Sequence, residues 1–299
     1  MKQAYDIYEE RRKHLLHAIE LSREGLVVSV FDTTDRIQHM FFRYLDPDHP
    51  ANRDKESEAY KDAIEELYVK MDGLLGEILS ILDDKDVLLV VSDHGFESFK
   101  WGINLNSWLW REGYLVFKDG VPPSGEWFPD VDWTRTRAYA YGLSGIFLNL
   151  RGRERSGIVD RGEERTKLCG ELKSKLTSML DQRNGMLPIR HVSLAEEALS
   201  GPYVDEAPDL FVGYEPGYRA SWNSVVGKVT YDIFEENTRS WSGDHSIDPD
   251  LMSGVFFSNW KLKDEEPSIT DIAPTVLNLF GLEKCVFHDG KVLSLNKPD

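Results

Sequence analysis

Two short apolar runs, each followed at once by a polar cluster, constrain the fold of this sequence most strongly. They cover residues 26–31 and 87–91 and are rich in Leu and Val. Almost continuous apolar runs of this length are typical of strands that are buried on both faces. An amphipathic segment over residues 57–82, with apolar side chains near a 3.6-residue period, lies between them. This order predicts a parallel βαβ unit with a right-handed crossover.

The rest of the chain continues the alternation of helices and strands. Further helices are predicted at 1–24, 162–183 and 269–280, strands at 210–214 and 254–258, and a hairpin from 138–141 and 146–150. Residues 96–137, rich in Trp, Gly and Pro, are expected to form an irregular insertion over the sheet. We therefore predict an α/β fold with a mostly parallel central sheet flanked by helices, in a single domain over residues 1–299.

Composition excludes several classes of function. With 35 Lys and Arg against 52 Asp and Glu, the formal net charge is 35 − 52 = −17, which argues against nucleic-acid binding or an anionic membrane surface. The longest apolar runs are strand-sized, and charges at residues 9–13 do not fit a secretory signal. Cys169 and Cys285 are far apart and outside any CxxC pattern. We expect a cytoplasmic protein without a disulfide framework.

Polar clusters follow both predicted strands, at 32–39 and 92–95, and a third cluster occupies 242–246. Ligands of open α/β sheets bind at the carboxyl ends of strands, so these clusters are expected to converge. Carboxylate and imidazole together favour zinc, manganese or ferrous iron over calcium, which prefers oxygen alone. The candidate metal ligands are Asp35, His39, Asp93, His94 and His245.

Each cluster also has an ordinary structural interpretation. Asp35 and His39, four residues apart on one helical face, could form a surface ion pair. Asp93 could cap a turn, and the segment around His245 could be a solvated loop. Two clusters at the same sheet edge favour the metal site. The remaining histidines are expected at the surface or in packing roles: His14, His17, His49, His191 and His288.

With these motifs in this order, residues 26–292 resemble the alkaline phosphatase superfamily, and most closely its type I phosphodiesterase and nucleotide pyrophosphatase branch. Segments 104–109, 207–210, 268–275 and 289–293 also fit the resemblance. It implies an alkaline-phosphatase-like fold and two divalent metal ions, zinc or manganese. One ion would be held by Asp35, His39 and His245, and the other by Asp93 and His94.

The sequence departs from that family at the nucleophile. In the family, a further Asp and a phosphorylated Ser or Thr lie upstream of the segment that matches Asp35, and only 34 residues precede Asp35 here. Thr33 and Thr34 belong to the matched segment, where turn and cap roles are expected. The resemblance thus predicts that this chain is a C-terminal portion of the enzyme and that its catalytic nucleophile is missing. Such a chain is expected to hold one metal ion and to self-associate through an exposed sheet edge.

The predicted function is metal-dependent hydrolysis of phosphate monoesters or diesters, including nucleotides, with this chain alone inactive. A phosphoglycerate mutase-like enzyme or a phosphonate hydrolase on the same scaffold is an alternative within enzymes. A non-catalytic metal-binding or interaction module is the alternative from another class.

Overall fold

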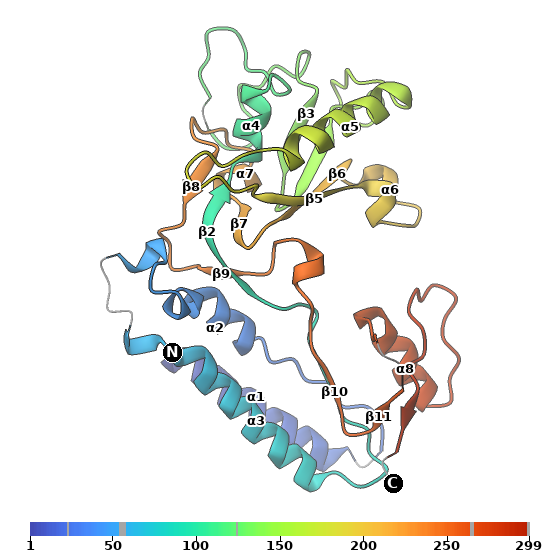
Figure 1. Cartoon of the computed structure of the whole chain (residues 1–299). Helices are drawn as coiled ribbons and strands as arrows, with labels where there is room; N and C mark the ends of the chain where they lie inside the picture. The colour runs from blue at the N-terminus through green and yellow to red at the C-terminus, as the bar shows by residue number, and fades with distance from the viewer. Residues whose placement is uncertain (23, 54–57, 124, 264–265, 298–299) are drawn as a thin grey trace. The chain divides into compact units, whose positions relative to one another are not determined.

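The computed structural model describes residues 1–22, 24–53, 58–123, 125–263 and 266–297. The chain forms two compact units, each assembled from segments far apart in the sequence (Figure 1). Unit 1 combines Met1–Ile37, Asp62–Phe96 and Met252–Asp299, and unit 2 combines Gln38–Lys61 and Glu97–Leu251. The prediction of a single alkaline-phosphatase-like domain stays a prediction.

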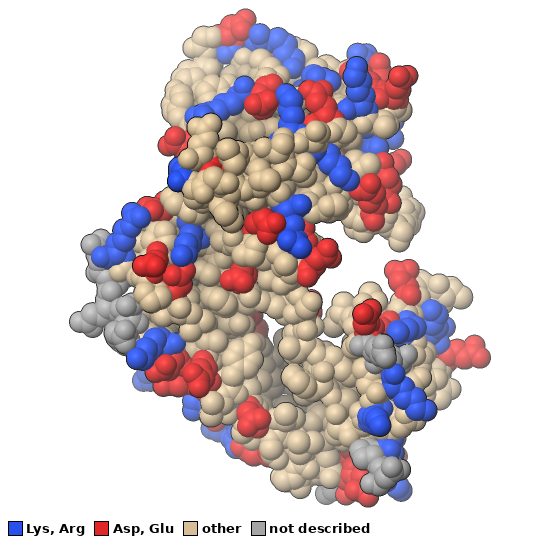
Figure 2. Space-filling view, in the orientation of Figure 1, with Lys and Arg blue, Asp and Glu red and all other residues tan. Residues whose placement is uncertain are grey.

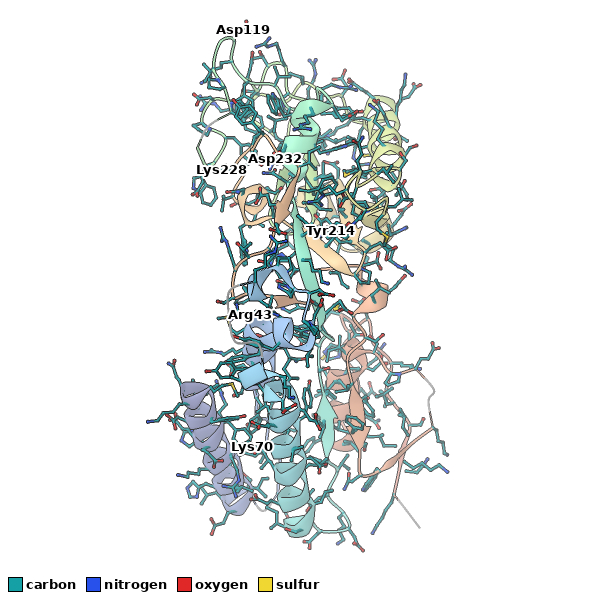
Figure 3. The ribbon with its side chains drawn as sticks, turned by 60° about the vertical axis from the view of Figure 1, so that its left-hand side comes forward. Arg43, Lys70, Asp119, Tyr214, Lys228 and Asp232 are labelled. Carbon is teal, nitrogen blue, oxygen red and sulfur yellow. The ribbon has the colours of Figure 1, made fainter. Side chains whose placement is uncertain are left out.

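Two helices of unit 1 run side by side in the same direction: α1 (Lys2–Leu21) and α3 (Ala63–Ile81). The Tyr8 hydroxyl donates to the carbonyl oxygen of Lys70 at 2.8 Å (Lys70 is labelled in Figure 3), and Arg12 pairs with Glu77 further along. The apolar positions of α3 face inward, as the sequence period predicts. Both predicted helices are confirmed, although Arg23 and Ser57 lie outside the described residues.

The predicted parallel βαβ unit is wrong. The structure assigns no strand to residues 26–31, whose Val28 and Val30 are 75% and 66% exposed. In unit 1, β1 (Leu89–Val91) pairs antiparallel with β10 (Phe256–Ser258), and β11 (Lys261–Leu262) pairs antiparallel with β12 (Leu295–Asn296). An apolar run indicates a preference for extended backbone, but it specifies neither the partner strand nor its direction.

In unit 2, β2 (Glu97–Ile103) is the centre of one sheet. It runs parallel to β7 (Gly217–Ala220) and antiparallel to β8 (Phe234–Glu236) and β9 (Gly243–Asp244). The short helix α4 (Leu105–Arg111) follows, its N-terminus capped by the Asn104 side chain. The prediction of an irregular insertion over 96–137 is therefore wrong for its first part. The alternation of Phe99, Trp101 and Ile103 with smaller or polar residues was a strand signal.

The second sheet of unit 2 is wholly antiparallel, in the order β3 (Ala138–Tyr141), β4 (Gly145–Leu148), β6 (Leu210–Tyr214) and β5 (Ile189–Leu194). The predicted hairpin is confirmed as β3 and β4. The polar helix α5 (Glu163–Thr177) contacts β5 and buries one leucine stripe. Tyr214, labelled in Figure 3, is fully buried at the end of β6.

The described chain is a mixed α/β structure with several sheets rather than one mostly parallel sheet. Of the strand pairs in the described residues, β2 with β7 is parallel and the others are antiparallel. The remaining elements are α2 (Thr33–Phe41), η1 (Phe42–Leu45), η2 (Pro50–Asn52), η3 (Glu58–Tyr60), α6 (Ala195–Ala198), η4 (Val204–Glu206), α7 (Trp222–Val225), η5 (Pro249–Leu251), η6 (Ile269–Asp271) and α8 (Ile272–Leu279).

Acidic and basic side chains are interspersed over the face of the molecule that Figure 2 shows. None of the described helices combines the length and the apolar character needed to cross a membrane.

Candidate metal centre

Helix α2 carries two of the predicted metal ligands. At its start, the Thr34 hydroxyl donates to the carbonyl oxygen of Phe31 at 3.2 Å, and Arg36 pairs with Asp32 at 2.7 Å. Asp35 lies in the first turn, where the helix dipole favours a carboxylate, and His39 lies in the last. A separation of four residues places both side chains on the same face of α2.

The third ligand follows β9, which is held between β2 and the end of α2. The backbone nitrogen of Ser242 donates to the carbonyl oxygen of His39 at 2.7 Å. Gly243 then pairs with Ser98 of β2, and a Cβ at position 243 would lie 2.5 Å from the carbonyl oxygen of Gln38. Only glycine allows this approach. His245 therefore enters the site from a loop packed directly on α2.

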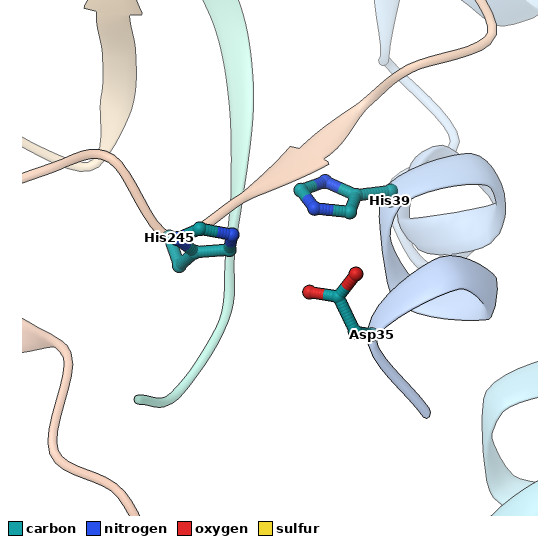
Figure 4. Close-up of side chains that lie close together, drawn as sticks. All are labelled: Asp35, His39 and His245. Carbon is teal, nitrogen blue, oxygen red and sulfur yellow. The ribbon is translucent and has the colours of Figure 1, made fainter. Parts of the chain in front are cut away.

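Asp35, His39 and His245 come together as the sequence predicts (Figure 4). Their ligand atoms all lie within 4.8 Å of one another. His39 is 3% exposed, and its Nδ1 lies 2.7 Å from the carbonyl oxygen of Gly243. That carbonyl can only accept, so Nδ1 carries the proton and the ring's lone pair is on Nε2. A backbone partner of this kind is what usually orients a metal-binding histidine.

Asp244, the residue before His245, has a buried carboxylate that accepts four hydrogen bonds. Its Oδ1 accepts hydrogen bonds from the backbone nitrogens of His245 and Ser246, both at 2.9 Å. Its Oδ2 accepts from Arg219 and, at 2.9 Å, from Trp241 Nε1. Burial alone would raise the pKa of Asp244, but Arg219 and these hydrogen bonds outweigh it and hold the pKa below its usual value.

Sequence reasoning missed Asp244, Trp241 and Arg219 as parts of this centre. Asp244 stood beside a predicted ligand and Trp241 just ahead of the same cluster, so proximity was the available signal for both. Nothing in the sequence pointed to Arg219, which comes from β7. Arg43 of η1, labelled in Figure 3, also contacts this loop, because its backbone nitrogen donates to Ser242 Oγ at 3.0 Å.

The other two predicted ligands lie in unit 1, directly after β1. Asp93 Oδ1 is 3.6 Å from His94 Nε2, and His94 Nδ1 is 2.9 Å from the carbonyl oxygen of Gly95. The backbone nitrogen of Gly95 donates to the carbonyl oxygen of Met252 at 2.9 Å, in the segment that leads to β10. Asp93 and His94 are not members of the three-residue group, and their role at a second metal stays a prediction.

Two residues that the sequence analysis did not place among the ligands, Thr33 and His49, are buried. Thr33 is 1% exposed, which does not suit an attacking hydroxyl. His49 is also 1% exposed; its Nε2 lies 3.0 Å from the Phe99 carbonyl oxygen, and its Nδ1 accepts from the Ala51 nitrogen at 3.1 Å. Burial lowers the pKa of His49, as expected for a neutral packing histidine.

Comparison with known proteins identifies the family. No curated protein matches the chain significantly. The sequence model of the type I phosphodiesterase / nucleotide pyrophosphatase family matches residues 4–247, a span that contains all three grouped side chains as well as Asp93 and His94. Because this match covers most of the chain, the protein belongs to the type I phosphodiesterase / nucleotide pyrophosphatase family, whose members are hydrolases acting on phosphoric ester bonds.

Proposed function

We propose that this chain is the metal-binding part of a phosphohydrolase with an alkaline-phosphatase-like fold, which acts on small phosphate esters, including nucleotides. The observation that carries the proposal is the convergence of Asp35, His39 and His245 to within 4.8 Å in a member of this family. One carboxylate and two imidazoles suit zinc or manganese and do not suit calcium. Three protein ligands are also the usual complement of an open catalytic zinc site.

A bound divalent ion at such a site acts as a Lewis acid that stabilises the negative charge developing on the phosphoryl oxygens. The chain's own residues prepare the position for it. The hydrogen bond from His39 Nδ1 to Gly243 fixes the ring and its tautomer, and Asp35 supplies negative charge from the same helix. Asp93 and His94 are proposed as ligands of a second ion, which they would hold less tightly because they are only two.

The nucleophile is proposed to be a Ser or Thr that this chain does not contain. Thr33 is 1% exposed, and the Thr34 hydroxyl is directed to the carbonyl oxygen of Phe31. Leu26, Val28 and Val30 are 58%, 75% and 66% exposed, so the described residues leave the apolar segment before α2 largely uncovered. These exposed side chains support a further section of polypeptide that packs here and supplies the nucleophile.

Initial rates on bis-aryl and mono-aryl phosphates, measured with zinc or manganese, test the proposal. The 299-residue chain is expected to be almost inactive, because an attacking group misplaced by about an ångström costs on the order of a hundredfold. The native protein with any upstream section included is expected to be faster by several orders of magnitude. His39→Ala and His245→Ala should abolish that activity, whereas His191→Ala, at an exposed position on β5, should not.

Other outcomes would contradict parts of the proposal. Robust turnover by the 299-residue chain that is lost in Thr33→Ala would identify Thr33 as the nucleophile. Inactivity of both proteins over a broad panel of phosphate esters, together with tight metal binding, would favour a non-catalytic metal-binding module.

A further inference from the structure

One carboxylate, Asp244, is connected to both histidines of the candidate centre. On one side, its Oδ1 accepts the backbone N–H groups of His245 and Ser246, which fixes the start of the loop that carries His245. On the other side, its Oδ2 accepts the indole N–H of Trp241 at 2.9 Å. The Trp241 ring is stacked on the His39 ring, with centroids 3.7 Å apart and planes inclined by 27°. Asp244 is thus linked to His39 through the Trp241 ring and to His245 through the backbone nitrogen of that residue.

Arg219 holds this carboxylate in place. Its side chain is 1% exposed, and Nη1 donates to Asp244 Oδ2. The guanidinium lies over the rings of Phe99 and Trp222, at 4.9 Å and 4.2 Å from their centroids. Nε donates to the carbonyl oxygen of Ala220 at 2.9 Å. A planar cation packed against two rings has little freedom, so Arg219 of β7 and Phe99 of β2 help to fix the position of Asp244.

Stability alone does not explain why the charged pair of Asp244 and Arg219 is buried. Burying a charged pair is usually no more stabilising than burying apolar residues of similar volume. Asp244 is 3% exposed, although the backbone N–H groups that it accepts could be satisfied by the hydroxyl of a serine. What a serine could not provide is the second oxygen, which binds Arg219 and Trp241 at the same time.

We infer that Asp244 is a positioning residue that sets the separation and orientation of the His39 and His245 imidazoles, and that Arg219 and Trp241 act through it. The inference rests on the proposed metal centre and names the residues that preorganise it. In Asp244→Asn, an amide N–H would face the donors of Arg219 and Trp241. The loop carrying His245 and the ring behind His39 would then shift independently.

The test is titration of the apoprotein with Co²⁺, followed by its visible absorption, and then displacement by Zn²⁺. Wild type is expected to bind with the absorption bands of a mixed nitrogen and oxygen site. Asp244→Asn is expected to weaken Co²⁺ binding about 10- to 100-fold, as is usual when an outer partner of a metal ligand is removed, and to change the band positions at saturation. Trp241→Phe keeps a ring against His39 but loses one hydrogen bond, so a smaller loss of about 3- to 10-fold is expected.

Asp209→Asn is the matched control. Asp209 is likewise buried, at 1% exposure, and is paired with two arginines, Arg153 and Arg165, but it lies directly before β6 and bonds the backbone of Leu148. It should lower the melting temperature as Asp244→Asn does and leave Co²⁺ affinity and spectrum unchanged.

The outcomes separate the inference from the function it rests on. No Co²⁺ binding by wild type would overturn both. Binding by wild type that is unchanged in Asp244→Asn would overturn the inference alone, as would equal weakening in Asp209→Asn. If Asp244→Asn does not fold, Trp241→Phe decides, and wild-type affinity in that variant overturns the inference.

Discussion

Gly243 lies against the carbonyl oxygen of Gln38 so closely that a Cβ would stand 2.5 Å from it, and 2.8 Å from Phe42 Cβ. Gln38 precedes His39, and Gly243 is two residues before His245. This close approach, together with the hydrogen bonds of Ser242 and Gly243 to His39, joins two ligands that are more than two hundred positions apart in the sequence. We therefore expect the geometry of the candidate metal centre to depend on the absence of a side chain at position 243.

Gly243→Ala should accordingly damage both stability and metal binding. The added methyl meets backbone, which cannot move aside, so β9 must separate from α2. A loss of about 1–3 kcal/mol in the free energy of unfolding is expected, together with weaker Zn²⁺ binding. Chemical denaturation and metal titration measure the two effects.

Gly170→Ala provides the control for a glycine substitution in the same unit. Gly170 lies within α5, and a Cβ there would meet nothing within 4 Å. Its replacement should stabilise the protein by up to about 1 kcal/mol, since alanine favours helix, and should leave metal binding unchanged. Equal behaviour of the two variants would contradict the role given to the contact at Gly243.

Metal stoichiometry is the second prediction. The group of Asp35, His39 and His245 offers three ligands, whereas Asp93 and His94 offer two. The 299-residue chain should retain about one zinc or manganese ion after dialysis, as measured by elemental analysis. The double variant His39→Ala, His245→Ala should lose it, and Asp93→Asn should keep it. Two tightly held ions per chain would refute this expectation.

These residues also show how far the sequence alone could be interpreted. The spacing of Asp35 and His39 on one helix is a local property, and their placement on one face could be predicted from the helical period. His245 was a candidate because it lies in a third polar cluster at 242–246, and the family resemblance grouped it with Asp35 and His39 on one metal. Arg219 could not be anticipated, because its contact with Asp244 exists only once β7 and β9 have both packed on β2.

The main errors of the sequence analysis concern which segments form strands and how those strands pair. The runs at 26–31 and 87–91 resemble each other in composition, but only the second contains a strand, and its partner is β10 from the far end of the chain. Pairing depends on non-local contacts, which an apolar run does not encode. Helices were predicted better, because α3 and α5 each carry a periodic apolar stripe within one segment.

A third prediction concerns stability in acid. Asp181 is fully buried and bonded to Arg183 at 2.6 and 2.8 Å and to the Tyr218 hydroxyl at 2.8 Å. Arg183 holds the pKa of Asp181 below its ordinary value of 3.8. A lowered pKa contributes stability that is fully present above the unfolded value and is lost as the pH falls below it.

Asp181→Asn should therefore cost about 2 kcal/mol near pH 7 and flatten the loss of stability below about pH 4. Denaturant melts from pH 7 to pH 2.5 give the comparison with wild type. Asp160→Asn, which removes an exposed ion pair with Arg151, should change stability by less than about 0.5 kcal/mol at any pH. An unaltered acid limb in Asp181→Asn would refute the assignment.

The two free cysteines should differ in reactivity. Burial raises the pKa of Cys169 to about 11, so little thiolate forms at pH 8, whereas Cys285 is only partly buried. Iodoacetamide at pH 8 should modify Cys285 first and leave Cys169 intact until the protein unfolds. Peptide mass spectrometry at intervals, with and without denaturant, measures both rates. Similar rates in the folded protein would contradict the packing of α5.

The last prediction concerns the exposed segment that leads into α2. Leu26, Val28 and Val30 occupy alternate positions of a segment to which no strand is assigned, and all three are more than half exposed. An unpaired apolar segment of this kind tends to associate with another chain. The isolated chain should therefore self-associate, and the double variant Val28→Lys, Val30→Lys should shift it toward monomer in sedimentation velocity over a range of concentrations. Tyr203→Lys, at an equally exposed position in unit 2, should have no such effect because Tyr203 lies outside this segment. A wild-type chain that sediments as a monomer at every concentration would show that the exposed valines do not form an association surface.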